Sequence, residues 1–149
     1  MKTFARIFLY IWQLPQNIIG FLLTRKVEMK SFRNLYFHTT GKNQDVIFYF
    51  KKNFFNSGVS LGNYIILDYF YMGKETVINA IRHEYGHQVQ SKILGWLYLP
   101  LIGLPSIVRN IWNRIAHKKW ESFKRYKWYY KGYPEKWADE LGDTARAFI

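Results

Sequence analysis

The stretch that decides the fold is TVINAIRHEYGHQVQSKILG, residues 76–95. Its apolar residues recur with the period of an α-helix, so they would share one side of that helix. These residues are Val77, Ala80, Ile81, Tyr85, Val89 and Ile93. The pattern predicts a helix over residues 76–94, and Gly95 stands where a helix commonly ends.

The middle of this helix carries the pentapeptide HEYGH. His83 and His87 are four positions apart, so their imidazoles leave the same face one turn apart and could share one metal ion. Glu84 lies one step round the helix from the two histidines. It is therefore poorly placed to be the main metal ligand but well placed to hold a water bound to the metal. HExxH zinc hydrolases divide the roles in this way. The alternative is a pair of surface histidines on an amphipathic helix.

A third ligand would define the class of site. Two known spacings need a histidine at position 93 or a glutamate near position 107, and isoleucine occupies both. The next candidate is Glu135 in YPEKWADELG, where Pro134 predicts a helix start and puts Glu135 in its first turn. Asp139, one turn later, could accept the second ring N–H of a ligand histidine. The alternative role for Glu135 is that of a carboxylate stabilising a helix N-terminus.

Two small residues agree with a site shared between two helices. Gly86 lies inside HEYGH, and Ala138 lies inside EKWAD. Small side chains are expected where two helices must approach closely around one metal.

HEYGH followed by EKWAD resembles the HExxH and ExxAD motifs of the gluzincins, most closely the branch with the membrane-embedded prenyl-protein (CAAX) endopeptidases and their bacterial heat-shock relatives. HEYGHQVQSKILGWLYLPLIGLPS and EKWADELG are also similar to short bacterial proteins and to the tail domains of Rhs-type toxins. The resemblance implies zinc on His83, His87 and Glu135, with Glu84 as general base and Asp139 as a residue that supports a ligand without binding the metal. This chain is far shorter than the prenyl-protein endopeptidases and lacks their set of clear spanning helices, so their substrates are not implied.

Residues 27–71 change to a strand pattern, with many β-branched and aromatic residues. Turn signals at residues 40–43, 56–58 and 61–63 divide this region. We predict a small, mostly antiparallel sheet. At 149 residues the chain has the length of one domain. Together these observations predict a single α+β, zincin-like domain over residues 1–149, with an HExxH helix and a C-terminal helix that supplies the third ligand.

Composition restricts the partners and ligands. The formal net charge is +12, which favours anionic partners such as a membrane surface or a nucleic acid. There is no cysteine, so disulfides and thiolate metal sites are excluded and a metal must use His, Asp or Glu.

Residues 1–26 form an apolar N-terminal segment that we expect to be helical. Residues 7–24 carry no formal charge, but Gln13, Pro15, Gln16 and Asn17 stand at the centre. We therefore favour an interfacial or re-entrant segment over a spanning helix, and no cleavage site of a signal peptide follows. The alternative is a helical hairpin, kinked at Pro15, that packs on the domain's own core.

Two further segments are relevant to a membrane. Residues 93–108 are uncharged and interrupted by two prolines, so they could dip into a membrane interface, cover the active site or pack in the core. Residues 109–131 interleave eight Lys and Arg with aromatic residues. This mixture suits the headgroups of an anionic bilayer, whereas nucleic acid is less expected because no nucleic-acid fold motif accompanies it. The alternative is a solvated helix pair with its aromatics on the core.

The expected function is that of a zinc metallopeptidase at a membrane surface, in a bacterial cell, with a cytoplasmic location as second choice. Zn²⁺ would activate a water, Glu84 would act as general base, and the substrate would be a peptide or protein. Tyr133 is the first candidate to stabilise the oxyanion and His117 the second. An edge strand near residues 58–62 could pair with an extended peptide. The alternatives are an inactive zinc-binding protein and a basic membrane- or nucleic-acid-binding module with an accidental HExxH.

Overall fold

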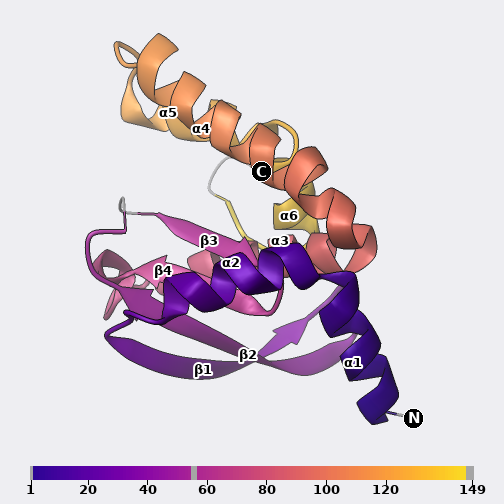
Figure 1. Ribbon diagram of the computed structural model, residues 1–149. Coiled ribbons are helices and arrows are strands. Elements are labelled where there is room, and N and C mark those ends of the chain that lie inside the picture. Colours follow the sequence, from indigo (N-terminus) through magenta and orange to yellow (C-terminus); the bar gives the residue numbers. More distant parts are fainter. Residues whose placement is uncertain (1, 55–56, 147–149) are drawn as a thin grey trace.

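Four strands form one sheet in the computed structural model, which describes residues 2–54 and 57–146 (Figure 1). The strands are β1 (Met29–Phe37), β2 (Lys42–Lys51), β3 (Gly58–Leu61) and β4 (Tyr64–Asp68), in the order β1-β2-β4-β3. β1 pairs antiparallel with β2, and β3 with β4, but β2 and β4 are parallel. The sheet is therefore mixed: its outer pairings are antiparallel, as predicted for most of the sheet, and the central pairing is parallel.

The parallel pair has a topological cause. The chain forms β3 at the edge, one strand away from β2, and then turns back at Gly62 so that β4 fills the position between them. Gly62 has a positive φ of 62°, which a residue without a Cβ adopts at little cost. Turn signals in the sequence located this reversal but could not show that the returning strand lies inside the sheet.

Helix α3 (Val77–Leu94) packs its apolar face on the sheet. It follows the predicted bounds, and Gly95 ends it with φ 56°. Ile81 and Tyr85 of α3 are in the core cluster with six buried sheet residues: Phe37, Val46, Phe48, Phe50, Ile65 and Leu67. The predicted α+β class is confirmed, and the helix that carries HEYGH lies directly on the core.

The N-terminal segment is a bent pair of helices, α1 (Lys2–Trp12) and α2 (Leu14–Thr24), joined at Gln13 and inclined by 87°. The bend precedes Pro15, which lies in the first turn of α2. α2 packs on the sheet face opposite to α3, because Gly20 contacts Tyr64, and Tyr64 and Ile66 face away from the core residues Ile65 and Leu67. The alternative of a segment that packs on its own domain therefore holds for α2, but the helices are not a hairpin and α2 lies on the sheet face away from the core cluster.

The polar side chains at the centre of this segment hydrogen-bond to the rest of the domain. The buried Gln16 donates to Ser91 Oγ (3.0 Å) and to the Gly95 carbonyl (2.8 Å), while Gln13 Oε1 accepts from Ser91. Asn17 Oδ1 accepts the backbone N–H of Asn63 at 2.8 Å. Along the described chain, no single helix has the length and apolar character needed to cross a membrane, although α1 and α2 together pass the same test across their bend.

The C-terminal half supplies the helices that surround the polar side of α3. A short 3-10 turn η2 (Gly95–Leu97) and a π-helical turn η3 (Leu99–Gly103) lead into α4 (Leu104–Ala116), followed by α5 (Ser122–Lys131) and α6 (Glu135–Leu141). Figure 1 shows α4 and α5 extending together from the body, with α6 beneath them near α3. A further 3-10 turn, η1 (Tyr69–Tyr71), follows β4.

Candidate metal centre

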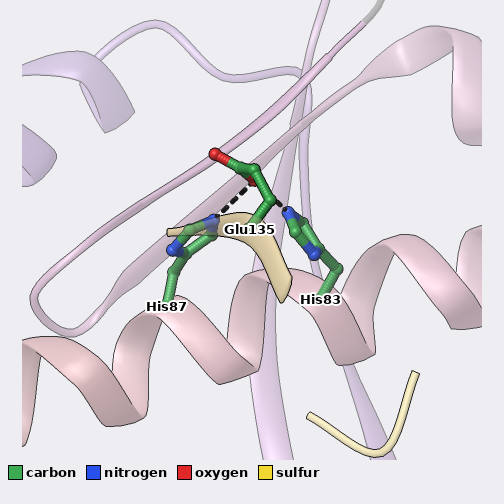
Figure 2. A group of neighbouring side chains, drawn as sticks. All are labelled: His83, His87 and Glu135. Carbon is green, nitrogen blue, oxygen red and sulfur yellow. Dashed lines mark hydrogen bonds and ion pairs between the residues drawn. The ribbon is translucent and has the colours of Figure 1, made fainter. Parts of the chain in front are cut away.

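Three side chains converge where α6 crosses α3. His83 and His87 rise from the same face of α3 toward Glu135, the first residue of α6 (Figure 2). Glu135 Oε2 lies 3.0 Å from His83 Nε2 and 3.2 Å from His87 Nε2. All three residues are buried, and each offers a ligand atom within 4.8 Å of the others. They lie close enough to bind one metal ion.

Each imidazole ring is oriented by a side-chain oxygen atom that lies within hydrogen-bond distance of its Nδ1. His83 Nδ1 lies 2.7 Å from Asp139 Oδ1, and His87 Nδ1 lies 2.7 Å from Gln90 Oε1. Since a carboxylate or an amide oxygen accepts a hydrogen bond, each Nδ1 carries the proton. The Nε2 atoms face Glu135, and each could bind a metal after losing any proton that it shares with this carboxylate.

Asp139 is itself held by Arg146. The guanidinium makes two hydrogen bonds to the carboxylate, at 2.9 Å and 2.7 Å, and stacks 3.6 Å above the ring centre of Tyr130. Burial raises the pKa of Asp139, but hydrogen bonds to His83 and Arg146 outweigh this effect and lower it. Burial likewise lowers the pKa of His83, but hydrogen bonds to Asp139 and Glu135 prevail and raise it to about 9. The metal-free cluster is therefore a buried charge network.

The second oxygen of Glu135 is bound by a hydroxyl group. Ser106 Oγ on α4 donates to Glu135 Oε1 at 2.5 Å, and Tyr129 on α5 also hydrogen-bonds this carboxylate. Burial raises the pKa of Glu135, but the charges and hydrogen bonds of His87 and His83 outweigh it and hold the pKa well below its usual range. Glu135 is thus ionised, with one oxygen anchored and the other directed at the histidines.

Glu84 lies beside the cluster without joining it. Its side chain is buried, and Oε2 has no hydrogen-bond partner within residues 2–54 and 57–146. A Cβ on Gly58 of β3 would lie 2.5 Å from Oε1, so the carboxylate occupies the space that a larger residue would fill. Burial raises the pKa of Glu84. A buried acceptor without a partner beside two imidazoles and a carboxylate fits a metal that carries a water.

The cluster opens into a cavity of about 690 Å³. Glu84, His83, His87 and Glu135 line it together with β3, η1, α4 and α5. Tyr71 and Tyr130 contribute their side chains to the wall, and burial is the largest cause of the raised pKa of both phenols. Both therefore present neutral hydroxyl groups at neutral pH. The site is reached from solvent through this cavity.

The two candidates for oxyanion stabilisation lie elsewhere. Tyr133 is 57% exposed, and its hydroxyl donates to the Leu101 carbonyl at 2.5 Å. His117 stacks on Trp120 with ring centres 3.7 Å apart and bonds Asn113. Neither lines the cavity around the cluster. A position next to the third ligand in sequence did not bring Tyr133 to the site, because the backbone turns into α6 at Pro134.

Sequence reasoning missed several residues that shape the cluster. Gln90 had a usable signal, since it lies three positions after His87 on the same helix face. Ser106, Tyr130 and Arg146 had none, because they lie on other elements and only the fold brings them to the ligands.

Comparison of the chain with protein-family models, with curated proteins and with solved structures gives no significant match.

Proposed function

We propose that this chain is a zinc-dependent peptidase that uses Glu84 as its general base. The observation that carries the proposal is the buried Glu84 side chain, whose Oε2 has no hydrogen-bond partner among the described residues, beside three convergent side chains that could hold a metal. A purely structural metal site has no need of such a carboxylate. The HExxH and ExxAD spacing of the sequence agrees with the gluzincin resemblance.

Zinc is the metal that these ligands favour. Two imidazoles and one carboxylate are a set found in catalytic zinc sites, and they leave one coordination position open. The histidines present Nε2 with Nδ1 hydrogen-bonded behind, which fixes the tautomer needed for binding. When bound, the metal would polarise a water and the scissile carbonyl, which is the Lewis-acid part of the chemistry.

Glu84 would perform the proton transfers. Burial raises its pKa above the ordinary value of 4.5, which makes the carboxylate a stronger base. Its carboxylate would take a proton from the attacking water and then deliver that proton to the leaving amine. Within the part of the chain that the structure describes, Oε2 of this carboxylate makes no hydrogen bond, so this oxygen is available for both steps.

An extended peptide would lie along β3. This strand is at one edge of the sheet, and all four of its residues line the cavity with the histidines. An edge strand offers backbone groups to an added strand, and a peptide bound in this way would cross the cavity next to Glu84. The proposed substrate is therefore a peptide bond in an extended segment of a peptide or protein.

The test compares two variants of the purified chain. Glu84→Gln should retain as much zinc as the parent and lose about 10²–10⁴-fold in hydrolysis of a quenched-fluorescence peptide library. Glu135→Ala should lose both zinc and hydrolysis. A parent protein with one zinc per chain and no hydrolysis would favour an inactive zinc-binding protein. A parent that retains no zinc would favour the accidental HExxH.

A further inference from the structure

Helix α4 exposes its apolar face, whereas a helix of a water-soluble domain usually buries that face. Its apolar stripe, Leu104, Ile107, Val108, Ile111, Trp112 and Ile115, has the i, i+3/i+4 spacing of one helix face, and every member is exposed, Ile115 by 68%. The polar residues Ser106, Asn110 and Asn113 line the cavity, where Leu104 and Ile107 join them. An amphipathic helix normally buries its apolar stripe, so this stripe requires another partner.

Helix α1 has the same feature. Phe4, Ile7, Phe8 and Ile11 are each more than half exposed, and Phe4 reaches 77%. Within the described chain, the bend at Gln13 carries α1 away from the sheet, and Figure 1 shows it projecting from the body near the start of α4. Its apolar side chains contribute little to the core, so the domain's own folding does not explain them.

The two exposed stripes are connected through η2 and η3. Trp12 Nε1 donates to the Lys92 carbonyl at 3.2 Å, and Trp96 Nε1 donates to the Ile11 carbonyl at 3.0 Å. These bonds hold the end of α1 against the end of α3, where Trp96 and Leu97 of η2 are also exposed. We call the exposed apolar side chains of α1, η2, η3 and α4 the apolar belt.

Positive charge accompanies the belt. Arg6 is exposed on α1, and four exposed lysines lie between the end of α4 and the middle of α5: Lys118, Lys119, Lys124 and Lys127. The whole chain carries a formal charge of +12. A second copy of the chain would bring like charge against like charge, whereas an anionic lipid surface would attract these residues.

We propose that the apolar belt docks on the surface of an anionic bilayer. The exposed apolar side chains would enter the boundary between headgroups and acyl chains, Trp12, Trp96 and Trp112 suit that boundary, and the lysines would face the headgroups. This inference goes beyond the proposed function, since docking needs no metal. It bears on the substrate, because Leu104 and Ile107 belong both to the belt and to the cavity wall, so docking would place the cavity at the bilayer surface.

The test is vesicle flotation of the full chain with chelator present. We expect binding to phosphatidylcholine vesicles that contain phosphatidylserine, weaker binding to phosphatidylcholine alone, and weakening by salt. The double variant Ile111→Asp/Ile115→Asp should reduce binding by about tenfold or more, since two apolar side chains can no longer be buried. Neither residue lines the cavity. Trp112→Ala is a milder second variant that adds no charge and should reduce binding several-fold.

The matched control is Phe32→Asp/Ile47→Asp. These residues face each other across β1 and β2, are exposed, and give the same change of charge away from the belt. Their vesicle binding should equal that of the parent, and light scattering without lipid should give one mass for all variants. An equal loss in both double variants would overturn the proposal. It would also fail if the belt variants dissociated an oligomer while their vesicle binding was unchanged, because the belt would then be covered by a second copy.

Discussion

Gly86 of α3 and Ala138 of α6 lie in direct backbone contact, so that a Cβ built on Gly86 would overlap the carbonyl oxygen of Ala138. This contact is where α6 crosses α3, and it places Glu135 above His83 and His87. The small residues of the two motifs thus set the distance between the helices that carry the three candidate ligands.

Gly86→Ala should move α6 and weaken both the fold and the metal site. Overpacking at a fixed backbone contact costs about 1–3 kcal/mol of the free energy of unfolding. Urea unfolding and zinc titration measure the two effects. The control is Gly103→Ala, where the added Cβ would lie 3.6 Å from Leu99, an ordinary contact. Comparable losses in the two variants would contradict the role of the crossing.

Gln90→Leu should reduce zinc affinity without removing a ligand. Gln90 Oε1 fixes the His87 ring through Nδ1, and loss of such a partner commonly costs about 10–100-fold in metal affinity. Competition with a chromophoric chelator measures the affinity. Gln88→Leu makes the same change on the same helix, where the amide oxygen accepts from Lys92 rather than from a histidine, and it should leave affinity unchanged. Equal affinities in the two variants would show that Gln90 is dispensable.

Removal of zinc should lower thermal stability. A metal that binds only the native state at about 100 times its dissociation constant adds about 2.7 kcal/mol to the free energy of unfolding, or roughly 5–10 °C in melting temperature. Differential scanning calorimetry with and without chelator measures the shift. Glu135→Ala should melt at one temperature under both conditions. A shift that persists in this variant would place the stabilising metal elsewhere.

Lys92 should make the free energy of unfolding depend on pH in the alkaline range. Burial lowers its pKa below the ordinary 10.5, so the unfolded chain binds this proton more tightly than the native one. Lys92 therefore lowers the free energy of unfolding. This cost is present in full at pH values below the native pKa of Lys92, and it disappears as the pH rises through 10.5. Lys92→Met should therefore raise the free energy of unfolding at pH 7, and the gain should shrink on approach to that value. Lys136→Met, at an exposed position, is the control. A gain that is constant with pH would contradict this assignment.

Local sequence patterns predicted the parts of the site that local geometry controls. The spacing of His83 and His87 fixes their common face on any helix, and Pro134 places Glu135 in a first turn wherever the rest of the chain lies. Tyr133 shows the limit of this reasoning, because adjacency in sequence does not determine where a side chain points. The parallel pairing of β2 and β4 shows the same limit for strands, since strand order depends on long-range contacts.

The sequence by itself determined the HEYGH helix, the third-ligand helix, the absence of thiolate ligands and the positive charge, because helix period and composition act over short distances. Only the tertiary structure decided which groups support the ligands, such as Arg146 behind Asp139 and Ser106 behind Glu135. It also decided that the apolar stripe of α4 faces outward. A periodic pattern shows that a helix has two faces, but packing of the whole chain decides which face is buried.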